Sequence, residues 1–63
     1  MKDQNRLRER TIEFRNELDL PVTKFLKKVN LSRTGYYEWL AGNYNLSEQR
    51  AAIIDDFLKR FGF

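Results

Sequence analysis

Residues 31–42 read LSRTGYYEWLAG and have the pattern of one short helix with a start, a buried face and an end. Ser32 is a residue type that caps the N-terminus of helices. Tyr36 and Trp39 follow at a spacing that places both rings on one helix face. Gly42 is the residue type that most easily adopts the left-handed conformation after a helix. The stretch therefore predicts a helix whose aromatic face packs against the rest of the chain.

The other face of this predicted helix carries short or hydrogen-bonding side chains instead of a run of Lys and Glu. Its members are Arg33, Thr34, Gly35, Tyr37 and Glu38. Within a helix Gly35 costs about 1 kcal/mol of propensity relative to Ala, and it also permits close approach of a partner to the backbone. Such a varied face is typical of an element that presents side chains to a partner.

Charge is unevenly distributed along the chain, although the net charge of the 63 residues is only +3. Residues 20–37 contain four basic residues and no acidic one, whereas residues 1–19 are balanced and residues 38–56 are net negative. A local excess of positive charge is the electrostatic footprint of a phosphate-binding surface, as found in nucleic-acid-binding proteins. The alternative is a solvated, lysine-rich helix face.

Length and composition restrict the class of protein. A chain of 63 residues allows one domain, residues 1–63, with a modest core, although a domain cut from a larger regulator stays open as an alternative. The absence of His and Cys and of any phosphate-binding loop argues against an enzyme, a metal site or a cofactor. Asp55 and Asp56 are neighbours on a helix and are expected to face solvent. The charged N-terminus and the short apolar runs predict a cytoplasmic protein.

Hydrophobic periodicity predicts four helices and no strand. The first begins at Asp3 or Asn5 and ends near residue 18, with i, i+3 ion pairs of opposite charge on its exposed side. These pairs are Arg6–Glu9 and Arg10–Glu13. The apolar face of this helix is assigned to Leu7, Ile12, Phe14 and Leu18.

A tight turn separates the second and third predicted helices. Pro21 ends the first helix and starts the second, which covers residues 21–29. Asn30 tolerates the left-handed conformation and leaves about three residues before the third helix, residues 32–41. Two short helices joined by so tight a turn are typical of a helix-turn-helix.

The fourth helix is predicted over residues 47–60, with Ser47 or Asn45 as its N-cap. The chain then ends in FLKRFGF, which holds more aromatic side chains than one small core needs. We therefore predict a homodimer contact at the C-terminal helix, formed by Phe57, Phe61 and Phe63.

Residues 20–42, LPVTKFLKKVNLSRTGYYEWLAG, resemble the helix-turn-helix of lambda-repressor/Cro-like (XRE-type) regulators. The resemblance covers about residues 5–60 and implies a compact, all-α, lambda-repressor-like domain of four or five helices. It departs from the family pattern at Leu26, where Ala is usual, and at Asn30, where Gly is usual. The matching positions begin with the hydrophobic pair Phe25-Leu26, the turn residue Asn30 and the hydrophobic residue Leu31 that fills the turn. They continue with the helix cap Ser32, the two core-facing aromatic residues Tyr36 and Trp39, and the final glycine Gly42.

The resemblance implies sequence-specific binding of double-stranded DNA by a small transcriptional regulator of the repressor or mobile-element control type. In this family the third helix lies in the major groove. Transferred to this chain, the base-reading residues are Ser32, Arg33, Thr34, Tyr37 and Glu38. The predicted phosphate contacts are Lys24, Lys27, Lys28, Asn43, Tyr44 and Asn45. The alternative is a protein–protein interaction module that keeps the fold without binding DNA.

Overall fold

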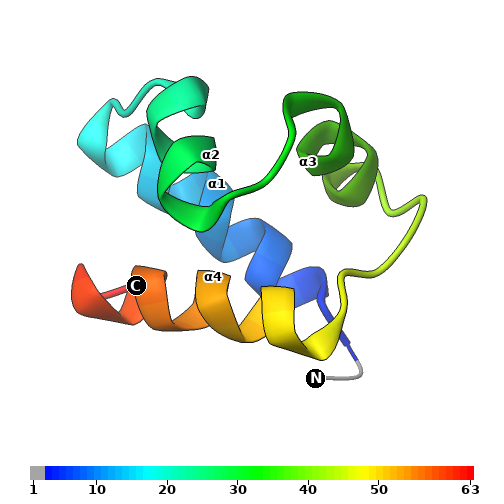
Figure 1. Cartoon of the computed structure of the whole chain (residues 1–63). Helices are drawn as coiled ribbons and strands as arrows, with labels where there is room; N and C mark the ends of the chain where they lie inside the picture. The colour runs from blue at the N-terminus through cyan, green and yellow to red at the C-terminus, as the bar shows by residue number, and fades with distance from the viewer. Residues whose placement is uncertain (1–2) are drawn as a thin grey trace.

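The computed structural model describes residues 3–63, which form four α-helices and no strand (Figure 1). The predicted all-α, four-helix fold is therefore confirmed. The observed helix ends lie close to the predicted ones, and of the two predicted starts for the first helix the structure has the later one. The helices are α1 (Asn5–Leu18), α2 (Val22–Val29), α3 (Arg33–Leu40) and α4 (Glu48–Arg60).

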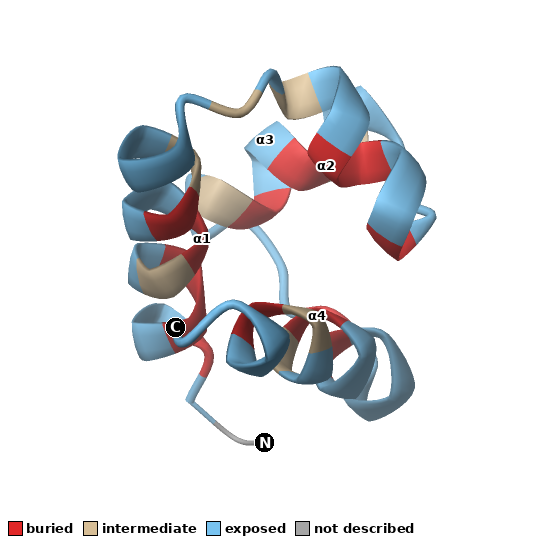
Figure 2. Cartoon of the chain, turned by 90° about the vertical axis from the view of Figure 1, so that its left-hand side faces the viewer, coloured by how far each residue is buried: buried red, intermediate tan, exposed pale blue. Residues whose placement is uncertain are grey.

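The core lies where the four helices meet. α1 packs against α4, and α2 packs against both α3 and α4. Figure 2 shows the buried side of each helix turned toward the middle of the molecule and the exposed side turned outward. The buried apolar residues are Leu7, Phe14, Phe25, Leu26, Val29, Tyr36, Trp39, Leu46, Ala51, Ile54 and Leu58.

The helix ends follow the local signals in the sequence. The Ser32 hydroxyl accepts a hydrogen bond from the Gly35 amide at 3.0 Å, and the Ser47 hydroxyl caps α4 in the same way at 3.2 Å. Of the two predicted caps for α4, Ser47 is thus the one used. Asn30 is left-handed with φ of 55°, and Gly42 is left-handed with φ of 84°. The predicted three-residue turn between α2 and α3 is confirmed.

The predicted apolar face of α1 is partly wrong. Leu18 is 47% exposed and Ile12 is 44% exposed, so neither belongs to the core. Their places on the buried side are taken by Gln4, Arg8 and Thr11, which are polar. The reason is that this side of α1 faces α3 and the loop after it, where backbone and side-chain polar groups need hydrogen-bond partners.

The predicted pair Arg10–Glu13 is also wrong, whereas Arg6–Glu9 is present at 3.2 Å. Arg10 instead donates from Nη1 to Asp55 Oδ1 at 2.5 Å and from Nε to the carbonyl of Phe63 at 2.6 Å. Asp55 is therefore an ion-pair partner of α1 and not a solvent-facing residue. Arg10 ties α1 to the end of the chain.

Asp55 is expected to make folding pH-dependent. A hydrogen bond from Arg10, and to a smaller extent one from Lys59, lowers the pKa of the Asp55 carboxyl below its ordinary value. A carboxylate with a depressed pKa stabilises the fold above its unfolded pKa, and this contribution is lost as the pH falls through the folded pKa. We expect Asp55→Asn to reduce the free energy of unfolding by about 1 kcal/mol at neutral pH, and by progressively less as the pH falls below about 4 and through the lowered folded pKa.

Urea unfolding of both proteins at about pH 7 and about pH 3 measures this difference. Asp56→Asn is the matched control, because Asp56 is exposed and forms no ion pair with any other residue of the range 3–63. An Asp55→Asn effect of equal size at both pH values contradicts the ion-pair explanation.

Candidate nucleic-acid interface

α3 has one buried face and one exposed face, as the sequence predicts. The rings of Tyr36 and Trp39 are fully buried. On the opposite side lie the five predicted base-reading residues, all of them exposed, and we call this surface the α3 face. It comprises Ser32, Arg33, Thr34, Tyr37 and Glu38.

The C-terminal end of α3 is tied to the start of α1 by the amide of Gln4, which is 2% exposed. Its oxygen accepts hydrogen bonds from the Trp39 indole nitrogen at 2.7 Å and from the Leu46 amide at 2.9 Å. Its nitrogen donates to the Leu46 carbonyl at 2.8 Å. The Gln4 side chain thus links Trp39 of α3 to Leu46, the buried residue of the loop that follows α3.

Arg8 makes a second connection between α1 and the end of α3. Its Nε donates to the Trp39 carbonyl at 2.5 Å, and its Nη2 donates to the Tyr44 carbonyl at 2.9 Å and to Asn45 Oδ1 at 3.0 Å. The guanidinium also lies 5.3 Å from the centre of the Trp39 ring system. A cation at this position satisfies a terminal carbonyl of α3 and suits the negative end of the helix dipole.

Sequence reasoning missed these positioning residues. The available signal was the spacing of Gln4, Arg8 and Thr11, which places all three on the face of α1 that also carries Leu7 and Phe14. Thr11 completes the set, because its hydroxyl accepts a hydrogen bond from the Tyr36 hydroxyl at 3.1 Å. A polar residue within an apolar stripe indicated a buried hydrogen-bond partner, and in this fold each of the three residues has a partner on α3 or on the following loop.

A side chain of the same chain, Tyr44, approaches the backbone closely at Gly35. The Tyr44 hydroxyl donates to the Gly35 carbonyl at 2.6 Å. A Cβ atom at position 35 would lie 2.7 Å from the Ser32 hydroxyl and 3.1 Å from the Tyr44 hydroxyl. Gly35 therefore makes room for both the cap of α3 and the loop that follows the helix.

The loop residues predicted to contact phosphate each have a partner within the chain. Tyr44 bonds Gly35, Asn45 bonds Arg8, and Asn43 donates to the Glu38 carboxylate at 2.6 Å. These bonds give the loop a structural role that the sequence pattern did not indicate. The proposed DNA contacts of Glu38 and of the loop stay predictions.

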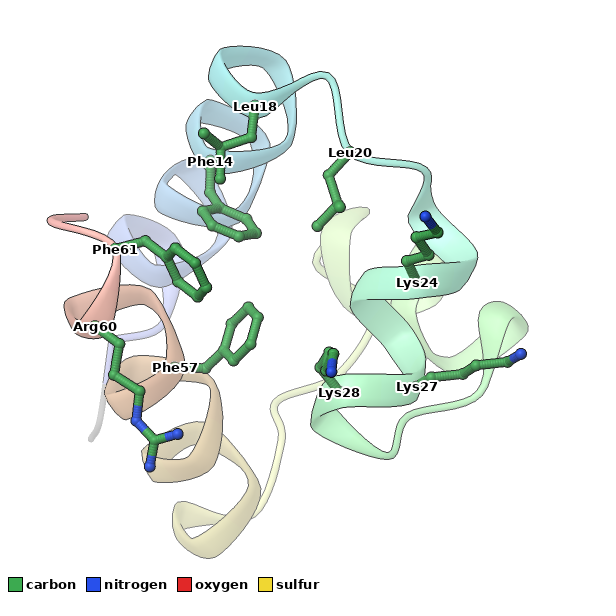
Figure 3. A pocket seen from close by; sticks show the side chains of 9 residues that line it. All are labelled: Phe14, Leu18, Leu20, Lys24, Lys27, Lys28, Phe57, Arg60 and Phe61. Carbon is green, nitrogen blue, oxygen red and sulfur yellow. The ribbon is translucent and has the colours of Figure 1, made fainter.

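The three predicted phosphate-binding lysines of α2 line a groove. They are exposed, and no residue of the predicted α3 face lines this groove. The groove has a volume of about 810 Å³, and we call it the lysine groove. Its lining residues, shown in Figure 3, are Phe14, Leu18, Leu20, Lys24, Lys27, Lys28, Phe57, Arg60 and Phe61. The structure thus divides the predicted site into two surfaces.

Comparison of this chain with protein-family models, curated proteins and solved structures found no match. Among residues 3–63, no helix has both the length and the apolar character needed to cross a membrane.

Gln4→Ala is expected to reduce the free energy of unfolding by about 2–3 kcal/mol, because it leaves the buried N–H groups of Trp39 and Leu46 without an acceptor. Urea unfolding followed by the fluorescence of the single tryptophan measures the loss. Gln49→Ala is the matched control, since Gln49 is exposed on α4. Equal effects of the two substitutions would contradict the role assigned to Gln4.

Gly35→Ala is expected not to stabilise the protein, although Ala in a helix ordinarily gains about 1 kcal/mol over Gly. The added methyl group would displace the Ser32 hydroxyl, and loss of that cap costs about 1 kcal/mol. In a Ser32→Ala background, which already lacks the cap, Gly35→Ala should recover most of the ordinary gain. A double-mutant cycle by thermal unfolding tests this coupling, and additive effects would show that the two residues do not interfere.

Proposed function

We propose that this chain binds double-stranded DNA sequence-specifically, as a small transcriptional regulator with α3 in the major groove. The main support for the proposal is that the Arg33 and Thr34 side chains, at the start of α3, are exposed and without a polar partner in the described part of the chain. The helix that presents them is fixed in place by its buried face and by Gln4 and Arg8.

The chemistry of these side chains suits base reading. The guanidinium of Arg33 can donate two hydrogen bonds to O6 and N7 of guanine, and the methyl group of Thr34 can contact that of thymine. Tyr37, which is 44% exposed, can hydrogen-bond a phosphate or stack against a sugar. Both Arg33 and Thr34 lie in the first turn of α3, the part of a recognition helix that meets base edges.

The short connection between α2 and α3 and the resemblance to lambda-repressor/Cro-like regulators also support the proposal. α2 and α3 are joined by only three residues, and Asn30 at the turn accepts a hydrogen bond from the Arg50 side chain of α4. Lys24, Lys27 and Lys28 on α2 are proposed to supply phosphate contacts.

The homodimer predicted through Phe57, Phe61 and Phe63 stays a prediction, and two of these residues, Phe57 and Phe61, also line the lysine groove. Regulators of this type bind two half-sites as dimers. Phe57, Phe61 and Phe63 all pack their rings against Phe14 within the chain, with ring centres 5.5, 5.2 and 5.5 Å away, and Phe61 is in addition 51% exposed. Sedimentation at high protein concentration, with and without DNA, tests the dimer, and a monomer under both conditions would exclude it.

The lysine groove favours a second candidate function, a protein–protein interaction module without DNA binding. An amide NMR titration with a duplex of random sequence at about 50 and 200 mM salt separates the two functions. DNA binding predicts shifts at Ser32, Arg33 and their neighbours that weaken as salt rises. If no amide of α3 shifts at the lower salt, the DNA-binding proposal is wrong.

Once a binding site has been selected from a random DNA library, Arg33→Ala should lose about 1–3 kcal/mol of discrimination at one base pair. Lys28→Ala should weaken binding to all sequences alike and reduce the salt slope by about 1. Arg60→Ala is the matched control for Arg33, because it removes an exposed arginine outside the α3 face. Fluorescence anisotropy with the selected site and its single-base variants measures these effects. Equal losses for Arg33→Ala on selected and random DNA would contradict its base-reading role.

A further inference from the structure

We propose that the lysine groove is a docking site for an acidic, amphipathic segment of another protein. The groove runs between α2 on one side and the ends of α1 and α4 on the other. Figure 3 shows Lys24 and Lys28 on the α2 side, Arg60 on the α4 side, and the rings of Phe14, Phe57 and Phe61 between them, while the Lys27 side chain extends away from the rings. The floor is therefore apolar and the rim is basic.

The floor exposes apolar surface that the fold does not cover. Leu18 and Phe61 are each about half exposed, and they line the same groove. The ring of Phe61 is held by its neighbours, with its centre 5.2 Å from that of Phe14 and 5.1 Å from that of Phe57. Contiguous exposed apolar surface with a polar rim is characteristic of interaction sites.

The charge of the rim identifies the chemistry of the occupant. Among residues 3–63, four cationic residues and no acidic one line the groove, and the charged groups of Lys24, Lys28 and Arg60 are the ones beside its apolar floor. None of Lys24, Lys27, Lys28 and Arg60 forms an ion pair within the described part of the chain. Because the cations stand on both sides, an occupant that carries several negative charges along its length complements the groove better than one with a single charge.

Charge also argues against a second copy of this chain as the occupant, and therefore against the predicted homodimer contact, because Phe57 and Phe61 of that contact line the groove. A two-fold symmetric dimer places the same surface against itself, so the four cations of one groove would meet the four of the other. A fatty acid would offer one carboxylate to four cations. A DNA duplex would pair the lysines with phosphates but leave Leu18 and Phe61 in water.

An amphipathic helix meets both requirements. Its apolar residues at i, i+3, i+4 and i+7 can contact the floor, and acidic residues beside them can reach the rim. The proposal goes beyond DNA binding and does not depend on it. The two functions share the lysines of α2, whereas Leu18 and Arg60 belong only to the groove.

The test uses a designed, fluorescently labelled helical peptide of about 15 residues, with Leu and Phe anchors at these spacings and Glu elsewhere. Two control peptides have Ala at the anchor positions or Lys in place of Glu. We expect only the acidic peptide with intact anchors to bind, with amide shifts at Leu18, Leu20 and Phe61. Anisotropy gives the affinity, and NMR locates the site.

Matched substitutions on the protein provide the decisive comparison. Leu18→Ser should weaken peptide binding about fivefold or more, whereas Ile12→Ser should change it less than about twofold. Both residues are similarly exposed on α1, but only Leu18 lines the groove. Arg60→Gln should weaken binding about threefold, and Lys59→Gln, one residue earlier on α4 and outside the groove, should not. None of the four substitutions should change DNA binding through the α3 face.

Several outcomes overturn the proposal. These are the absence of groove shifts at about 1 mM acidic peptide, equal effects of Leu18→Ser and Ile12→Ser, or tighter binding of a single-stranded oligonucleotide than of the peptide. Concentration-dependent self-association that Leu18→Ser abolishes would assign the groove to a second copy instead. Amide spectra of each variant show whether it is folded, so that a loss of binding is not confused with unfolding.

Discussion

The amide of Gln4 and the guanidinium of Arg8 determine where α3 lies. Both side chains are buried, and together they bond the indole and the carbonyl of Trp39 and the backbone of the loop after α3. A buried polar group that lacks a hydrogen-bond partner reduces the stability of the fold. The arrangement is therefore stable only when all of these hydrogen bonds form together. The orientation of α3 therefore depends on hydrogen bonds from α1, in addition to the apolar contacts of Tyr36 and Trp39.

This arrangement leaves the beginning of α3 free while its end is held. The bonds from Gln4 and Arg8 reach the C-terminal end of the helix and the loop that follows it, Thr11 bonds Tyr36 in the middle of the helix, and the loop returns to Gly35 through the Tyr44 hydroxyl. The first turn, with Arg33 and Thr34, remains available to a partner. A rigidly held helix with free polar side chains loses little conformational entropy on binding beyond that of the side chains themselves. This is the physical basis of the proposed DNA interface.

The basic residues of positions 20–37 are divided between two surfaces, the lysine groove and the α3 face. In the sequence, the lysines of α2 and Arg33 form a single basic segment, and the resemblance assigns all of them to DNA. In the structure, Lys24, Lys27 and Lys28 border an apolar groove completed by α1 and α4, whereas Arg33 lies on the α3 face outside it. If both proposals hold, an acidic protein segment and a DNA backbone would compete for the same lysines, which would couple the two kinds of binding.

The sequence by itself determined the features that depend on neighbouring residues. These include the four helices, the Ser32 and Ser47 caps, the left-handed Asn30 and Gly42, and the burial of Tyr36 and Trp39, because capping, backbone preference and helical periodicity act over a few residues. Only the tertiary structure decided which polar residues are buried and which apolar ones are exposed. Gln4 and Arg8 are buried against residues more than thirty positions away in the chain, to which they form hydrogen bonds. Arg10 pairs with Asp55 across the α1–α4 contact instead of with Glu13 in its own helix. Leu18 is half exposed because neither α2 nor α4 covers the end of α1, and no local pattern contains that information.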